Sequence, residues 1–251
     1  MNQTILITGA SAGFGAAMAR RFTADGNRVI AAARRADRLQ ALKAELGESL
    51  LPLPLDLADT AALDALPASL PSAWQNVDVL VNNAGLALGL DPAHKASISE
   101  WDQMVSTNIT GLLHLTCALL PGMVERDRGH VVNLGSTAGT YPYPGGHVYG
   151  ASKAFVAQFT LNLKADLIGT GVRVTLIEPG LVGGTEFSQV RFAGDTSRAD
   201  AVYANTEPLT PEDIAEAVAW VIGLPQRMNV NRMELMPTCQ APGPLAIKRR
   251  A

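Results

Sequence analysis

Short apolar, β-branched runs alternate with longer helix-like segments along the chain. The short runs predict strands, because aliphatic and β-branched side chains favour a buried, pleated surface. Their expected ranges are Thr4–Thr8, Arg28–Ala33, Leu50–Leu55, Val77–Asn82, His130–Leu134, Val172–Glu178 and Val230–Met236. The segments between them predict helices at Phe14–Asp25, Arg38–Leu46, Thr60–Leu66, Glu100–Arg126, Tyr149–Ile168 and Pro211–Ile222.

This order of elements predicts an α/β fold with a Rossmann-type, doubly wound parallel sheet and helices on both faces. Continuous apolar strands need cover on both sides, and right-handed crossovers place the helices there. No segment rich in Pro, Gly or Ser divides the chain, so residues 1–251 are expected to form a single domain. The segment 181–208 has no clear periodicity, and such long segments are often functional lids.

Composition narrows the class of protein. Hydrophobic residues make up 47% of the chain and charged residues 17%, which predicts a buried core. A net charge of −3 gives no electrostatic basis for binding nucleic acid or an anionic membrane. We find no apolar run near the roughly 18 residues of a membrane helix, and strand-like "TILITGA" leaves no room for a signal peptide. A cytoplasmic protein is expected, with the terminal "KRRA" as a solvated tail.

No metal site is expected. Cys117 and Cys239 have neither metal-ligand spacing nor the pattern of a disulfide framework, and free buried thiols or pairing with a partner chain are the alternatives. His94, His114 and His130 also lack a mutual spacing typical of metal ligands and are interpreted as structural or surface residues.

The first predicted strand runs into "TGASAGFG", a glycine-rich turn before a helix. Glycines there let the backbone approach a pyrophosphate, while the helix N-terminus offers free N–H groups. The spacing is G-x-x-x-G-x-G rather than G-x-G-x-x-G, and packing of small residues is the alternative explanation. The position on the first strand–helix turn favours a dinucleotide site formed by Gly9, Ala10, Ser11, Ala12, Gly13, Phe14 and Gly15.

Arg34 and Arg35 follow the second strand, about 20 residues beyond the glycines, where an NAD site places an acidic residue on the ribose. Two guanidinium groups suit a 2′-phosphate instead, through charge and paired hydrogen bonds. A solvated arginine pair beside Asp37 is the alternative. With the glycine turn upstream, NADP is favoured over NAD.

Two further strand ends point to the same crevice, because ligands of doubly wound sheets bind at the carboxyl ends of the strands. Asp56, with Leu57 beside it, follows the third strand and can meet the adenine, although a helix cap is an equal alternative. Asn83, Ala84 and Gly85 follow the fourth strand, where small residues let a ribose lie against the backbone.

Tyr149 and Lys153 lie one helical turn apart and therefore on one helix face. Alcohol oxidation needs a base for the hydroxyl proton, and a tyrosine with its ordinary pKa of about 10 is a poor base. The charge of Lys153, together with an oxidised nicotinamide, can favour the phenolate. Ser136 can hold the substrate oxygen, and in reduction Tyr149 donates the proton. A solvated helix lysine and one more polar residue in "GSTAG" are the alternatives.

The segments "TGASAGFG", "NNAG", Ser136 with Tyr149-x-x-x-Lys153, and "EPG" occur in the order and spacing of the short-chain dehydrogenase/reductase family, which the whole chain resembles. Within it, "VNNAGLALGLDPAHKAS" and "EPGLVGGTEFSQVRF" are similar to bacterial NADP-dependent 3-hydroxy acid dehydrogenases, described as serine or allo-threonine dehydrogenases and malonic semialdehyde reductases. The resemblance implies a homotetramer.

The resemblance also assigns roles to residues that the pattern alone leaves open. Asn108, otherwise a helix-kink residue, would hold a water that links the lysine to solvent. Pro179 and Gly180 would turn the chain beside the nicotinamide. The family pattern then places a threonine five residues after the proline, but here Thr185 comes one position later. Contact with the nicotinamide amide would come from the backbone of Leu181 and Val182, or from a shifted Thr185.

A 3-hydroxy acid needs a cation for its carboxylate, and the expected lid contains Arg191. A lid arginine in a structural ion pair is the alternative, and His147 could also line the pocket. The predicted activity is hydride transfer between NADP and the 3-hydroxyl of serine, allo-threonine or 3-hydroxyisobutyrate, or reduction of malonic semialdehyde. The alternatives are a reductase of uncharged or carrier-linked carbonyls and a non-catalytic nucleotide-binding regulatory protein.

Overall fold

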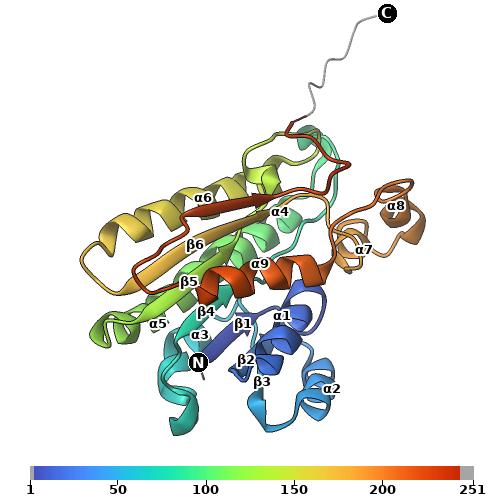
Figure 1. Ribbon diagram of the computed structural model, residues 1–251. Coiled ribbons are helices and arrows are strands. Elements are labelled where there is room, and N and C mark those ends of the chain that lie inside the picture. Colours follow the sequence, from blue (N-terminus) through green and yellow to red (C-terminus); the bar gives the residue numbers. More distant parts are fainter. Residues whose placement is uncertain (1–2, 244–251) are drawn as a thin grey trace, which may run out of the picture.

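A computed structural model describes residues 3–243, and the terminal "KRRA" lies outside them. These residues form one sheet of seven parallel strands in the order β3-β2-β1-β4-β5-β6-β7 (Figure 1). The strands are β1 Thr4–Thr8, β2 Arg28–Ala33, β3 Leu50–Pro54, β4 Val79–Asn82, β5 Gly129–Leu134, β6 Val172–Pro179 and β7 Arg232–Leu235. All predicted strands are confirmed, with ends that shift by one or two residues. The order reverses between β1 and β4, which opens a crevice there for a ligand.

The helices follow the predicted positions, with two short additions inside the lid. They are α1 Gly13–Ala24, α2 Ala36–Leu46, α3 Thr60–Ser69, α4 Ile98–Val105, α5 Gly111–Glu125, α6 His147–Asp166, α7 Phe187–Arg191, α8 Thr196–Ala201 and α9 Pro211–Gly223. The start of α9 shows why the sequence folds as expected. Thr210 and Asp213 form a reciprocal capping box, and Pro211 takes the first helical position, where its missing N–H costs nothing.

Helices cover both faces of the sheet, which confirms the doubly wound architecture. On β1, Ile5 and Ile7 point into a core shared with α1, α2 and α9. Leu6 points to the opposite side, into a core shared with α3, α5 and α6. Successive strand side chains alternate between faces, so a strand that is apolar at every position must be buried on both. Each of these three side chains has no exposed surface.

The helix predicted as Glu100–Arg126 is divided by a π-helical turn at Ser106–Thr110, between α4 and α5. Contrary to expectation, the continuous helical stretch Ile98–Glu125 is long and apolar enough, by length and composition, to cross a membrane. This is weak evidence, because core helices of soluble proteins meet the same criterion. Here α5 packs against α3 and β5, and α4 packs against α6.

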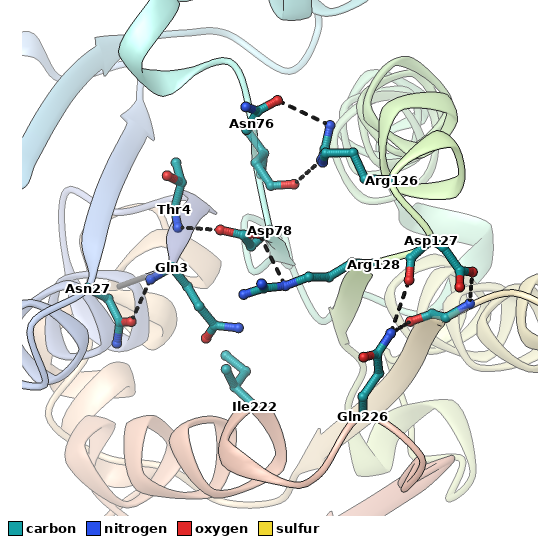
Figure 2. Close-up of polar contacts among 12 residues, drawn as sticks. Gln3, Thr4, Asn27, Asn76, Asp78, Arg126, Asp127, Arg128, Ile222 and Gln226 are labelled. Atoms are coloured by element: carbon teal, nitrogen blue, oxygen red, sulfur yellow. Dashed lines mark hydrogen bonds and ion pairs between the residues drawn. The ribbon is translucent and has the colours of Figure 1, made fainter. Parts of the chain in front are cut away.

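The amino edge of the sheet is tied together by polar side chains (Figure 2). Asp78 accepts a hydrogen bond from the backbone N–H of Thr4 at 2.9 Å, and its other oxygen lies 3.6 Å from Nε of Arg128. Arg126 donates to the carbonyl of Val77 at 2.9 Å. These contacts connect β1, the segment before β4 and the end of α5. None of the predicted site residues lies at this edge, which therefore serves stability.

The segment 181–208, which we call the lid, contains α7 and α8. Its two ends are joined, because Gly183 donates to the carbonyl of Leu209 at 2.8 Å and Leu209 donates to the carbonyl of Leu181 at 3.1 Å. Within the lid, the hydroxyls of Ser188 and Tyr203 lie 2.8 Å apart. Helices of five and six residues are too short to show a helical period in the sequence.

Candidate active site

A cleft of about 350 Å³ lies at the carboxyl edge of the sheet, beneath the lid. The predicted cofactor residues that line it are Gly9, Ser11, Ala12, Gly13, Phe14, Arg34, Arg35, Asp56, Leu57, Asn83 and Thr185. Ala84, Gly85 and the lid residues Glu186, Phe187 and Val190 complete much of its wall. Most of the residues predicted to bind a dinucleotide are thus gathered around one cavity.

The glycine-rich turn has the geometry that a pyrophosphate requires. Gly9 and Gly13 adopt φ values of +67° and +50°, which a side chain would strain. A Cβ on Gly15 would lie 2.4 Å from the carbonyl oxygen of Gly9, so only glycine fits there. Ala12 begins α1 without a side-chain cap, which leaves the first N–H groups of the helix free for an anion. Ala10 is fully buried behind the turn and shapes the cleft without lining it.

Asn83 braces this turn. Its side-chain amide donates to the carbonyl of Thr8 at 2.7 Å, and its backbone N–H donates to the Thr8 hydroxyl at 3.0 Å. Asn83 therefore holds the ends of β1 and β4 together at the wall of the cleft. Asp56 accepts from the backbone of Ala58 at 3.0 Å, and the cap of α3 is Asp59. The alternative that Asp56 caps that helix is thus wrong.

The two arginines after β2 differ in their surroundings. Arg34 is exposed on the cleft wall and forms no ion pair with any residue between 3 and 243. Arg35 donates from Nε and Nη2 to the hydroxyl of Ser11, at 3.1 and 3.0 Å, and from Nη1 to Glu186 at 2.8 Å. Together, Arg34, Arg35 and the Ser11 hydroxyl offer the charge and donors that suit a 2′-phosphate.

Tyr149 and Lys153 lie on the first turns of α6, as predicted. Lys153 donates from Nζ to the carbonyl of Leu134 at 2.8 Å, and burial lowers its pKa to about 8. Burial raises the pKa of Tyr149 to about 12, opposed by a hydrogen bond with Ser136 and by the charge of Arg191. Nζ of Lys153 lies 6.0 Å from the Tyr149 ring centroid. The residues of the chain alone therefore keep Tyr149 a neutral phenol, and the lowered pKa expected from Lys153 is not found.

Asn108 lies in the π-helical turn, so it is also the helix-kink residue of the alternative interpretation. Its side chain exchanges two 2.9 Å hydrogen bonds with the backbone of Leu86 and donates to Ser152 at 3.1 Å. A Cβ on Gly85, at the cleft wall, would lie 3.2 Å from Nζ of Lys153 and 3.3 Å from Oδ1 of Asn108. Gly85 therefore lies where the cleft wall approaches Lys153 and Asn108.

A buried polar network below the site fixes α6 on the sheet. Asn82 donates to Thr116 and to Asn133, each at 2.9 Å, and Asn133 donates to Thr160 of α6 at 2.9 Å. Because all four side chains are buried, a helix shift that broke one of these bonds would leave a polar group unsatisfied. The network thus holds the helix that carries Tyr149 and Lys153.

Arg191, at the end of α7, extends from the lid toward Tyr149. It donates from Nη2 to the hydroxyl of Tyr143 at 2.6 Å. Its guanidinium carbon lies 5.3 Å from the ring centroid of Tyr149 and 5.2 Å from that of Phe187. Its Nε is buried without a hydrogen-bond partner among the described residues. No ion pair of Arg191 exists within residues 3–243, which argues against the structural ion-pair alternative.

The residues predicted to contact the nicotinamide amide lie where the chain passes from β6 into the lid. Pro179 ends β6, and Gly180 donates to the carbonyl of Leu235 at 2.7 Å. A Cβ on Gly13 would lie 3.3 Å from Cγ2 of Thr185, so Thr185 sits over the glycine turn. Leu181 donates its N–H to Gln240, whereas both backbone groups of Val182 are free of hydrogen bonds within the described chain. A free N–H beside a free C=O would match a primary amide, but Val182 is buried and does not line the cleft, whereas Thr185 does.

The lining of the cofactor cleft contains neither His147 nor the predicted catalytic residues Ser136, Tyr149 and Lys153. Nε2 of His147 lies 3.1 Å from the carbonyl oxygen of Asp91, and its ring packs 4.9 Å from that of Trp101. His130 is buried with Nε2 at 2.8 Å from the Thr175 hydroxyl, and burial lowers its pKa. Within residues 3–243, no group of three or more His, Cys, Asp or Glu is arranged to hold a metal ion.

Three site residues were missed by sequence reasoning: Tyr143, Glu186 and Phe187. Phe187 and Arg191 are four residues apart, so they share a face of α7, and that spacing was a usable signal. The Phe187 ring lies 5.6 Å from the ring of Tyr149. No local pattern indicates Tyr143, because its partner Arg191 is distant in sequence.

A doubly wound sheet with a glycine-rich first turn and a Ser–Tyr–Lys cluster at its carboxyl edge defines a dinucleotide-dependent oxidoreductase. Residues 3–195 match the family model described as short chain dehydrogenase, and the chain belongs to that family. This confirms the resemblance inferred from the motifs.

Individual relatives agree with this assignment. The chain is 60% identical over 245 residues to a Salmonella typhi protein named NADP-dependent 3-hydroxy acid dehydrogenase YdfG, covering 98% of this chain and 99% of that protein. It is 50% identical over 241 residues to the serine 3-dehydrogenase of Agrobacterium fabrum, covering 96% of each. Among solved structures, the closed form of serine dehydrogenase complexed with NADP+ is 57% identical, with a TM-score of 0.97 and coverage of 99% of this chain and 100% of that one.

Proposed function

We propose that the protein is an NADP-dependent dehydrogenase that transfers hydride between its cofactor and the 3-hydroxyl of small 3-hydroxy acids. Serine, allo-threonine and 3-hydroxyisobutyrate are the expected substrates, and malonic semialdehyde is the expected carbonyl in the reverse direction. The observation that carries this proposal is Arg191, whose guanidinium lies 5.3 Å from the Tyr149 ring with a buried, unpartnered Nε. A carboxylate substrate would provide that partner.

The chemistry follows from the side chains around Tyr149. Bound NADP would supply the hydride acceptor and, when oxidised, a positive charge near the phenol. The charge of oxidised NADP, together with that of Lys153, would favour loss of the Tyr149 proton to give the phenolate. Ser136 positions the substrate oxygen, and the phenolate of Tyr149 takes its proton during oxidation, whereas the phenol donates the proton during reduction. Lys153, held by the carbonyl of Leu134, passes protons toward solvent beside Asn108.

The cofactor site accounts for NADP. Gly9 to Gly15 and the N-terminus of α1 would hold the pyrophosphate, and Arg34 with Arg35 would hold the 2′-phosphate. Asp56 and Leu57 would contact the adenine, Asn83 the ribose, and Val182 or Thr185 the nicotinamide amide, beside Pro179 and Gly180. Each of these assignments is an expectation supported by the position of the residue at the carboxyl edge of the sheet.

We also propose that the protein is a cytoplasmic homotetramer that acts on small molecules and binds neither nucleic acid nor membrane. Large apolar side chains exposed on α4 and α6 support assembly, because exposed apolar surface is often covered at an interface between subunits. They are Ile98, Val105, Phe155 and Leu161, with Ile168 just beyond α6.

The proposed function is tested by following NADP reduction and NADPH oxidation across hydroxy acids, semialdehydes and neutral alcohols. We expect serine, allo-threonine and 3-hydroxyisobutyrate to give kcat/KM values well above those of neutral secondary alcohols of equal size. Equal or higher values for neutral alcohols, or for carrier-linked carbonyls, would favour the alternative reductase.

Replacing Arg191 with alanine is expected to raise the KM for hydroxy acids roughly 10- to 100-fold, because one charge-assisted contact contributes about 1.5–3 kcal/mol. Activity on a neutral alcohol should change little. Arg198→Ala is the matched control, since Arg198 is a lid arginine that packs 4.5 Å from the Phe192 ring instead. An unchanged KM in Arg191→Ala would show that Arg191 does not bind the carboxylate.

A further inference from the structure

The lid contacts the rest of the domain on two sides of the cleft. On the substrate side, Arg191 bonds to Tyr143, and the Arg191 carbonyl accepts from the N–H of Gly89 at 3.0 Å. On the cofactor side, the polar side-chain contact from lid to domain is made by Glu186, one residue before α7. These two sides are linked through the five residues of α7.

Glu186 uses both carboxylate oxygens. Oε2 lies 2.8 Å from Nη1 of Arg35, and Oε1 lies 2.7 Å from Nη1 of Arg38. Hydrogen bonds from Arg38 and Arg35 lower the pKa of the carboxyl, so the group is ionised at neutral pH. A carboxylate that bridges two guanidinium groups is a small network, which is more effective than an isolated surface pair.

Arg38 has no other evident role. It lies in the first turn of α2, where a cation opposes the helix dipole, and two further arginines precede it closely in sequence. It does not line the cleft, and Glu186 is the polar partner of its side chain within residues 3–243. The ion pair with Glu186 offsets the unfavourable position of this charge.

Arg35 contacts both the lid and the glycine-rich turn. The same guanidinium that pairs with Glu186 also donates to Ser11 in the glycine-rich turn. Glu186 therefore restrains Arg35 in the orientation in which it lines the cleft. Movement of the lid away from the sheet would separate Glu186 from both arginines and release Arg35.

We propose that Glu186 and Arg38 are positioning residues that latch the lid from the cofactor side, so that lid closure and the placement of Arg35 depend on each other. The inference deepens the proposed function and rests on it only for the role of Arg35 in holding the cofactor phosphate. The latch predicts that Glu186 and Arg38, which are remote from the substrate, control how firmly Arg191 is held in position to bind the substrate.

The test is hydrogen exchange of the backbone amides in α7 and α8, measured on the NADP-bound protein without substrate. Glu186→Gln and Arg38→Gln should each raise the exchange rates roughly threefold or more. The double variant should not exceed Glu186→Gln, because Arg38 acts on the lid only through Glu186. In turnover assays, Arg38→Gln should raise the KM for the hydroxy acid by a similar factor and leave kcat nearly unchanged.

The matched control is the Arg20–Glu45 pair, which has the same chemistry and similar exposure but joins α1 to α2 away from the lid. Arg20→Gln and Glu45→Gln should leave lid exchange unchanged. The latch is refuted if Arg38→Gln leaves lid exchange at the wild-type rate, or if the effects of Glu186→Gln and Arg38→Gln multiply in the double variant. Failure of the wild-type protein to oxidise any hydroxy acid would refute the proposed substrate instead, since the exchange measurement needs no turnover.

Discussion

Replacing Tyr149 with phenylalanine is expected to lower kcat for hydroxy acids roughly 10²- to 10⁴-fold, the contribution typical of a positioned acid–base group. Phenylalanine keeps the ring that packs against Phe187 and Arg191 and removes the hydroxyl that exchanges the proton. Binding of NADP should therefore remain close to that of the unmodified protein. Steady-state kinetics and a fluorescence titration with NADPH would measure the two effects separately.

Tyr143→Phe provides the control in the same pocket. Its hydroxyl accepts the hydrogen bond from Arg191, so the loss should raise the KM for hydroxy acids while kcat changes little. Full turnover in Tyr149→Phe would remove Tyr149 from the catalytic assignment. A fall in kcat for Tyr143→Phe as large as that for Tyr149→Phe would indicate that the pocket, and not one proton donor, had been damaged.

Replacing Arg34 and Arg35 together with glutamine is expected to weaken NADP binding roughly 100-fold, from two charge-assisted contacts that are each reduced by exposure to solvent. NAD lacks the 2′-phosphate, so its dissociation constant should change only a few-fold. The ratio of the two constants, measured by titration, reports the phosphate contact directly. Arg20→Gln is the control, because Arg20 pairs with Glu45 and does not line the cleft.

The outcome that contradicts the phosphate assignment is an equal loss for both nucleotides. In that case the arginines would act on the fold of the turn through Ser11. The salt dependence separates the explanations further, since a phosphate contact weakens as ionic strength rises, whereas a steric defect in the turn does not.

Periodicity predicted the sheet and its covering helices well because those elements are long and apolar. Strand β1, with every residue buried, admits no interpretation except a strand covered on both faces. The π-helical turn at Asn108 was indicated only by the alternative interpretation of that residue as a helix kink, since the turn continues a helical pattern and differs only in its backbone hydrogen bonds. The lid helices α7 and α8 were not predicted because each is shorter than two full turns.

Motifs located the candidate catalytic residues, but the sequence could not give their electrostatics. Tyr149 and Lys153 were placed correctly on one helix face, yet the pKa of Tyr149 is raised because burial outweighs the favourable contacts. The partners of Arg35 and Arg191 come from segments far apart in sequence, and such contacts exist only once the chain has folded. Local pattern finds the chemical groups, and tertiary packing decides their protonation and orientation.

Backbone hydrogen bonds that join Leu181 and Gly183 to Leu209 hold the two ends of the lid together. Exchanging the residues between those ends leaves the chain path of every strand unchanged, and a longer or shorter loop costs little closure entropy. In the proposed function the lid would provide Arg191 for the substrate and Val182, Thr185 and Glu186 on the cofactor side, while the glycine turn and α6 would provide the pyrophosphate site and the proton-transfer residues. We expect substrate preference to change when the lid residues around Arg191 are exchanged while Thr185, Glu186, the glycine turn and α6 are kept.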